Sequence, residues 1–173
     1  DAEEAIPLDT IHDEIRFDRV SFNYEPGRPV LSDVSFTAKP GTVTAIVGPT
    51  GSGKTTVMSL LLRLYDPASG SITIDARNIN QFQVQSLRGK VAIALQENVL
   101  FASSVRDNIR YVVPDADEDA VRDAVRVACM DDYIDGLPFG LDTILGDRGG
   151  KLSTGQRQRL SIARAVVRDT PIL

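Results

Sequence analysis

The stretch VTAIVGPTGSGKTTVMSLLLRLY, residues 43–65, joins a short apolar run to a glycine-rich loop and then to apolar residues at helical spacing. A nearly continuous apolar run such as residues 43–47 is typical of a strand buried on both faces of a parallel sheet. The segment after the glycines predicts a helix that ends near Tyr65. A second apolar run, KVAIAL at residues 90–95, predicts another buried strand. Together these segments predict an α/β fold.

The loop itself predicts a phosphate site. Gly48 to Thr55 reads GPTGSGKT, which fits the pattern G-x-x-x-x-G-K-[ST] between a strand and a helix. Gly48, Gly51 and Gly53 let consecutive N–H groups turn toward one centre, where the dipole of the next helix adds positive charge. We expect a polyphosphate, with Lys54 reaching its β- and γ-phosphates and the Thr55 hydroxyl coordinating Mg²⁺. The alternative, a plain glycine-rich turn with a solvated lysine, is disfavoured because a strand and a helix both flank the loop.

The flanking sequence predicts a group of antiparallel strands and a helical region. Residues 15–24 and 30–38 alternate apolar and polar side chains around a turn-rich break, and residues 71–79 alternate again, which predicts antiparallel strands joined by tight turns. From Glu97 onward the sequence predicts mainly helices. One amphipathic helix is expected where apolar residues recur at i, i+4 spacing, at Ala120, Val121, Ala124, Val125 and Ala128.

Composition narrows the function classes. The 173 residues carry 19 basic and 24 acidic side chains, a net charge of −5, without a basic block, which argues against a nucleic-acid partner. A single cysteine, Cys129, and an N-terminus without a signal pattern indicate a reducing, cytosolic setting. No apolar run approaches the roughly 18 residues that cross a bilayer. The chain is therefore not expected to span a membrane itself, although it could belong to a membrane protein.

A second motif indicates a family. Residues 146–165, GDRGGKLSTGQRQRLSIARA, resemble the signature segment of the ATP-binding cassette (ABC) ATPases, whose usual form is L-S-G-G-Q followed by a basic helix. Ser153 and Gln156 also fit a plain capping box at a helix start. Both interpretations can hold together, because a capped helix N-terminus presents free N–H groups to a γ-phosphate.

The resemblance runs from about Ile15 to the end of the chain and is closest to exporter-type ATPase domains, so it implies further roles. Tyr24 would stack on adenine; the alternative is a core position on the same strand face as Phe22. Gln96 resembles the glutamine that meets the metal and links the site to the transport domain. The stretch TILGDRG, residues 143–149, resembles T-x-V-G-E-R-G, which is found in exporters.

The resemblance thus implies a composite site for ATP and Mg²⁺. Lys54 and Gln96 would be catalytic, and Thr55 and Gln96 would ligate the metal. The nucleotide-binding residues would be Tyr24, Gly48, Thr50, Gly51, Ser52, Gly53, Lys54, Thr55, Thr56, Ser153, Gly155 and Gln156. Two positions depart from the family pattern, because Thr154 replaces a glycine and Asp147 replaces a glutamate.

The resemblance also implies an organisation. Residues 1–14 are expected to be a linker outside the core, with His12 a solvated surface side chain. Residues 15–173 would form an incomplete ABC ATPase domain. It would comprise a P-loop NTPase (RecA-like) nucleotide lobe with an antiparallel β subdomain at 15–96, an α-helical signature lobe at 97–169, and the start of the Walker B strand at 170–173. The Mg²⁺-orienting Asp, the catalytic Glu and the switch His of the family would lie beyond Leu173.

We therefore expect the ATP-hydrolysing motor of an ABC exporter, at the cytoplasmic face of a membrane, in the first instance a bacterial inner membrane. Its partners would be a second ABC ATPase domain, identical or paralogous, and the transmembrane domains of a longer parent protein. Two alternatives stay open: a largely non-hydrolysing half of an asymmetric transporter, and a soluble ABC ATPase of translation or DNA repair.

Overall fold

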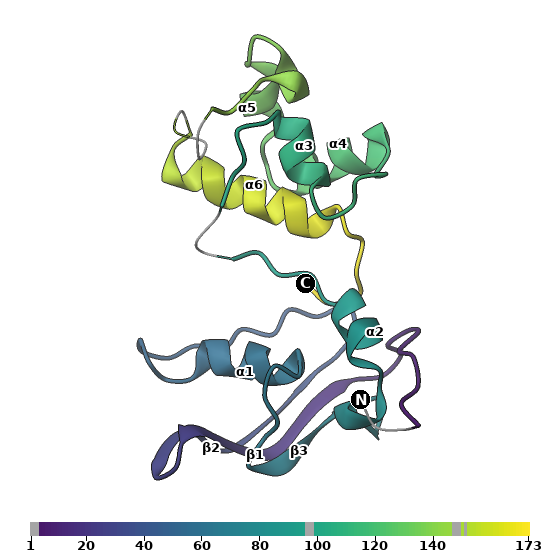
Figure 1. Ribbon diagram of the computed structural model, residues 1–173, viewed down its shortest axis with the longest axis vertical. Helices are drawn as coiled ribbons and strands as arrows, with labels where there is room; N and C mark the ends of the chain where they lie inside the picture. Colours follow the sequence, from purple (N-terminus) through teal and green to yellow (C-terminus); the bar gives the residue numbers. More distant parts are fainter. Residues whose placement is uncertain (1–3, 96–98, 147–149, 151) are drawn as a thin grey trace. The chain divides into compact units, whose positions relative to one another are not determined.

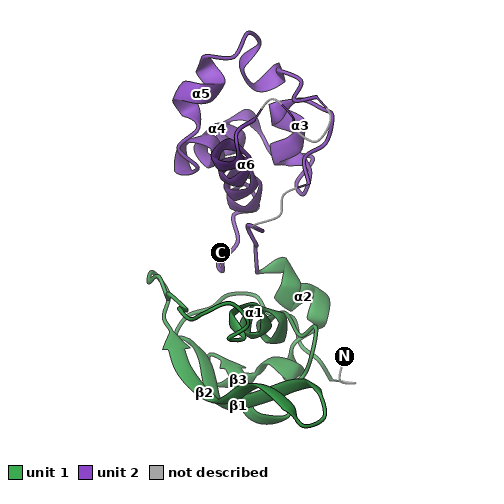
Figure 2. Cartoon of the chain, turned by 90° about the vertical axis from the view of Figure 1, so that its left-hand side faces the viewer, with its two compact units in different colours: residues 1–90 green, residues 91–173 purple. Residues whose placement is uncertain are grey.

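The structure is a computed structural model that describes residues 4–95, 99–146, 150 and 152–173. The chain divides into two compact units, Asp1–Lys90 and Val91–Leu173, each built from one continuous stretch of sequence (Figure 2).

The first unit is built on an antiparallel sheet of four strands in the order β2-β1-β3-β4 (Figure 1). The strands are β1 (Ile15–Glu25), β2 (Arg28–Ala38), β3 (Ser69–Ile74) and β4 (Arg77–Asn78). Alternation sends Phe17 and Ile72, which pair across β1 and β3, into the core. Gly70 has φ +82°, and a Cβ there would overlap the carbonyl of Arg19, so only glycine fits at this crossing. The predicted antiparallel strands are confirmed.

Helix α1 (Lys54–Leu61) follows the glycine loop, and its C-cap is Leu62, close to the predicted end. Val57, Leu60 and Leu61 form its buried face. The unit is completed by a 3₁₀ turn, η1 (Ile79–Gln81), and by α2 (Val84–Gly89).

The N-terminal segment was expected to stay outside the core, and for Leu8 this prediction was wrong. The side chain of Leu8 is 3% exposed, and its backbone N–H donates to Ser86 Oγ at 2.8 Å. Ile6 bridges Phe82 in parallel, with backbone bonds of 2.9 Å to Gln81 and 2.8 Å from Gln83. His12 is exposed, as predicted.

The two predicted buried strands do not form within the described residues. Residues 43–47 make no backbone hydrogen bond to any described group, and Val43 and Val47 are 98% and 88% exposed. Along residues 90–95 one parallel bridge joins Val91 to Ile172, with Ala92 N–H donating to Ile172 at 2.8 Å. An apolar run becomes a strand only where neighbouring strands satisfy its backbone, and no described strand flanks residues 43–47.

The second unit is helical, as expected. It contains α3 (Val105–Arg110), α4 (Glu118–Val127), α5 (Asp131–Asp135), η2 (Gly140–Asp142) and α6 (Thr154–Val166). The predicted amphipathic helix is α4, capped by Asp117, whose carboxylate accepts from Ala120 N–H at 2.8 Å. Leu160 and Ala163 of α6 are fully buried in the same core as Val121 and Val125 of α4.

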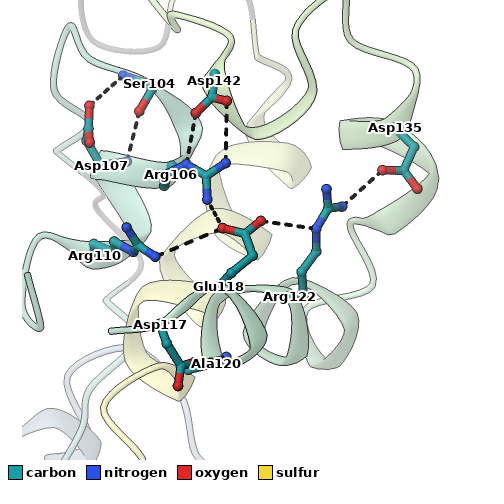
Figure 3. A network of polar contacts seen from close by, with 10 residues as sticks. All are labelled: Ser104, Arg106, Asp107, Arg110, Asp117, Glu118, Ala120, Arg122, Asp135 and Asp142. Atoms are coloured by element: carbon teal, nitrogen blue, oxygen red, sulfur yellow. Dashed lines mark hydrogen bonds and ion pairs between the residues drawn. The ribbon is translucent and has the colours of Figure 1, made fainter. Parts of the chain in front are cut away.

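An ionic network ties the surface of this unit together (Figure 3). Arg106 of α3 pairs with Glu118 of α4 and with Asp142 of η2, and Arg122 pairs with Glu118 and Asp135. No helix among the described residues is long and apolar enough to cross a membrane.

Candidate functional site

Two of the three glycines in the loop adopt a conformation that favours glycine, and Gly48 is not among the residues with positive φ. Gly51 and Gly53 have φ values of +83° and +87°, in the left-handed region that glycine adopts at low cost. A Cβ on Gly53 would also lie 2.6 Å from Leu31 Cδ2 and 3.1 Å from the carbonyl oxygen of Val30. Gly53 therefore holds the loop against β2 while it serves as the N-cap of α1.

The start of α1 is left open to an anion. It has no side-chain cap and no acidic residue in its first turn. The backbone N–H groups of Gly51, Gly53, Lys54 and Thr55 donate to no group in the described part of the chain. Unpaired N–H groups at the positive end of a helix dipole attract negative charge. The loop is thus an anion cradle made of backbone, whereas the N-termini of α3, α4 and α6 are capped by the side chains of Ser104, Asp117 and Ser153.

Lys54 stands over this cradle. Its ammonium donates to the carbonyl oxygens of Gly48 at 2.9 Å and Pro49 at 2.8 Å. The hydroxyl of Thr55 is exposed, and no described group bonds it. A hydroxyl beside a phosphate cradle fits one ligand position of a Mg²⁺ ion that travels with a polyphosphate. Among the described residues no cluster of three or more His, Cys, Asp or Glu side chains could hold a metal alone.

Tyr24 is a surface residue. Its side chain is 51% exposed, whereas Phe22 is 6% exposed and belongs to the core. The Tyr24 hydroxyl lies 3.1 Å from Thr56 Oγ1 in the first turns of α1. Its ring meets the rings of Phe22 and Tyr65 edge to face, with centroids 4.8 Å and 5.1 Å away. Tyr24 is therefore a half-exposed aromatic residue whose hydroxyl contacts the phosphate-loop helix and whose ring packs against two neighbouring rings.

Tyr65 was not among the predicted site residues. The sequence held only a weak signal for it, one aromatic residue just after the predicted helix, because its contact with Tyr24 depends on how the strand and the helix meet.

The signature segment forms the predicted capping box at the start of α6. Ser153 Oγ accepts from Gln156 N–H at 3.2 Å, and Gln156 Oε1 accepts from Ser153 N–H at 2.8 Å. Ser153 uses a lone pair in this bond, so its hydroxyl proton stays available to a ligand. The Thr154 hydroxyl accepts from Arg157 at 3.0 Å, which holds the extra side chain against the helix. Gly155 is exposed with open space around its Cα.

The predicted residues thus fall into two groups. Tyr24 and the loop residues from Gly48 to Thr56 gather in the first unit, and Ser153, Gly155 and Gln156 gather in the second. Gln96 and Asp147 lie outside the described residues.

Comparison with known proteins identifies the family that this chain matches. The family model described as "ABC transporter" matches residues 31–173. Antigen peptide transporter 2 of Mus musculus is 45% identical over 161 residues, which is 92% of this chain and 23% of that protein. The mycobactin import ATP-binding/permease protein IrtA of Mycolicibacterium thermoresistibile is 46% identical over 159 residues, 92% of this chain and 17% of that protein.

Among solved structures, that of a bacterial Atm1-family ABC exporter with ATP bound matches with a TM-score of 0.89 and 40% identity, over 98% of this chain and 30% of that one. This match confirms the predicted fold class, a P-loop ATPase fold with an antiparallel sheet and a helical unit. The chain spans less than a third of the length of each of these proteins.

Proposed function

Because this chain belongs to the ABC transporter family, we propose that it is the ATP-binding and ATP-hydrolysing part of a membrane transporter of the exporter type. One observation carries the proposal: at the start of α1, four backbone N–H groups that have no partner among the described residues lie beside Lys54 and the exposed hydroxyl of Thr55. A chain of phosphates supplies the oxygens and the negative charge that this cradle lacks.

Each residue of the cradle has a task in this proposal. The N–H groups of the loop hold the phosphates, and Lys54 exchanges its two carbonyl partners for β- and γ-phosphate oxygens. Thr55 and Gln96 would hold Mg²⁺, which neutralises charge between those phosphates when it is bound. Tyr24 would offer its exposed face to adenine. Water then attacks the γ-phosphorus in line with the leaving oxygen, and catalysis comes from position and charge neutralisation.

The signature helix completes the site from a second ATPase domain, identical or paralogous. Ser153 keeps a free hydroxyl proton, and the first N–H groups of α6 add positive potential, so the segment suits a γ-phosphate held by another chain. Two domains would pair head to tail and close on two ATP molecules. Transmembrane domains of the longer protein would follow this closing and opening, with the ATPase on the cytoplasmic face of the membrane, in the first instance a bacterial inner membrane.

The direction of transport is a separate part of the proposal. The TILGDRG stretch and the similarity to the Atm1-family exporter support export. A relative named for mycobactin import is as similar in sequence, so exporter-type sequence and export are separate properties. Transport in inverted vesicles, where the ATPase faces the added ATP, tests the direction. An exporter accumulates its substrate inside these vesicles, and an importer releases it from them.

Thr154 is the observation behind a second candidate, an ATP-binding domain that hardly hydrolyses. A β-branched side chain there stands beside the backbone that would approach the γ-phosphate. However, Thr154 is the first residue of α6, and its hydroxyl is bonded to Arg157, so the helix start is intact. Thr154→Gly should raise turnover at least tenfold if the threonine disables the site, and should leave it within the error of the assay if the site is competent.

Lys54→Ala tests the proposal directly. The variant loses charge-assisted hydrogen bonds to phosphate, each worth about 1.5–3 kcal/mol, so ATP affinity measured by calorimetry should fall at least tenfold. Lys39→Ala is the matched control, because Lys39 is an exposed lysine in the turn after β2 and its side chain has no described partner. Equal affinity in the two variants would refute the assignment of the loop.

A further inference from the structure

Asn108 of α3 is a fully buried polar residue in the helical unit. Its side-chain amide is bonded on both sides. Oδ1 accepts from Phe101 N–H at 2.9 Å, while Nδ2 donates to the carbonyl oxygens of Phe101 at 3.1 Å and Ser104 at 2.9 Å and to Ser103 Oγ at 3.1 Å. One side chain thus fixes the backbone of residues 101–104 to α3.

Arg164 of α6 is bound to the same place. Its Nε donates to the backbone carbonyl of Asn108 at 2.8 Å, Nη2 to Asn108 Oδ1 at 3.0 Å, and Nη1 to the carbonyl of Val99 at 2.9 Å. The Asn108 carbonyl lies in the last turn of α3, where carbonyls lack helical partners, so the guanidinium also caps α3.

The charge of Arg164 is held without a carboxylate. No described acidic side chain lies within ion-pair distance of it. The guanidinium carbon is instead 5.7 Å from the ring centroids of both Phe101 and Tyr111, which stack on each other at 4.3 Å. Burial lowers the pKa of Arg164 below its ordinary value. The rigid fork of the guanidinium bonds three fixed backbone and side-chain oxygens here, so this geometry favours a role in fixing direction.

The direction that these bonds fix is that of α6. This helix begins at the Ser153 capping box and carries Arg164 in its last turn, and its buried residues Leu160, Ala163 and Ala165 are apolar and nondirectional in their contacts. Outside Arg164, single bonds from Ser161 to the carbonyl of Leu95 at 3.5 Å and from Arg159 to the carbonyl of Cys129 at 3.0 Å also orient the helix. Arg164 contributes three directional bonds from one planar group, and such a fork restrains the rotation of the helix about its axis. That rotation determines where the N–H groups and the hydroxyl at the start of α6 point.

We propose that Arg164, together with Asn108, is a positioning residue that locks the segment from Val99 to Ser104 to the signature helix, so that the start of α6 is aimed at the γ-phosphate. This inference rests on the proposed function, because it concerns the same ATP site. It assigns a task to two residues that touch neither the nucleotide nor the phosphate loop.

The test uses the full-length protein that contains this chain, with Arg164→Lys as the first variant. Lysine keeps the charge but cannot reach three separate acceptors in a plane. Displacement of a reacting group by about 1 Å can cost about a hundredfold in rate, so kcat for ATP hydrolysis should fall at least tenfold. The Kd of ATP should stay within about twofold, because the phosphate loop and Tyr24 are unchanged.

Two more variants complete the design. Arg164→Gln keeps a planar donor but can serve fewer acceptors, and it should reduce kcat in the same way. Arg126→Lys is the matched control, since Arg126 is exposed on α4 and pairs only with Asp123 among the described residues, and it should leave kcat and Tm unchanged. A purely structural role would lower Tm and the yield of folded protein but leave kcat per folded molecule intact.

The outcomes separate the inference from the proposed function. A wild-type kcat in folded Arg164→Lys and Arg164→Gln would overturn the positioning role, and so would failure of both variants to fold, which would show that Arg164 serves stability. If ATP hydrolysis survives Lys54→Ala, the proposed function itself fails. Loss of hydrolysis in Lys54→Ala together with normal kcat in both Arg164 variants would remove the inference alone.

Discussion

At the scale of single residues, Tyr24 offers the most direct test of adenine recognition. Base stacking on an aromatic ring is worth about 1–3 kcal/mol, so Tyr24→Ala should weaken ATP and GTP binding alike, while Tyr24→Trp keeps most of the affinity. Tyr24→Phe keeps the stacking face and loses only the bond to Thr56. Calorimetry with both nucleotides measures the effect. A fall in Tm for Tyr24→Ala with unchanged affinity would assign the ring to packing.

At the scale of elements, Asp75 fastens the N-terminal segment to the sheet. Its carboxylate accepts from the N–H groups of His12 and Asp13 at 2.8 Å and of Glu14 at 3.1 Å. Burial alone would raise the pKa of Asp75, but these three bonds together lower it below the ordinary value. A carboxylate with a lowered pKa stabilises the docked segment above its unfolded pKa and loses that effect as the pH falls through the folded value.

We therefore expect the segment to release in acid or in Asp75→Ala. Bonds to a charged acceptor are worth about 1.5–3 kcal/mol, so amide exchange of residues 12–14 should quicken at least tenfold in Asp75→Ala at neutral pH. Asp33→Ala is the control, because the Asp33 side chain is exposed and has no described partner. Equal exchange in the two variants would show that the backbone bridges alone hold the segment.

Patterns within single elements were readable from the sequence, and contacts between distant elements were not. The capping box of α6 and the left-handed glycines depend on only a few neighbouring residues, so the local sequence is enough to predict them. The buried Leu8 bonds through its backbone to Ser86, which lies 78 positions away, and no local pattern predicts such a contact. The bonds of Asn108 to residues 101–104 and to Arg164 could not be predicted either. An asparagine in a helix is ordinary in sequence, and only the tertiary fold brings an arginine to it.

At the scale of the whole molecule, the proposed pairing of two chains predicts complementation. Lys54→Ala disables one phosphate cradle, and Ser153→Arg blocks one signature. In a mixed dimer both lesions fall on the same composite site, so the other site is intact and part of the ATPase activity should return on mixing. Phosphate release by the mixed full-length proteins, with subunit exchange shown by two affinity tags, measures this. Demonstrated heterodimers without recovered activity would place each site within one chain.

The two bonds from Lys54 to the carbonyls of Gly48 and Pro49 turn ligand capture into an exchange reaction. The ammonium already bonds two neutral carbonyls of the loop, so the gain from the charged oxygens of an incoming anion is reduced by the loss of those two bonds. A single phosphate or sulfate offers little surplus, whereas a triphosphate brings more charge and enough oxygens to occupy lysine and amides together. The affinity for nucleotides should therefore rise steeply from mono- to di- to triphosphate. The loop thus selects ligands by the number and charge of their phosphates, independently of the base.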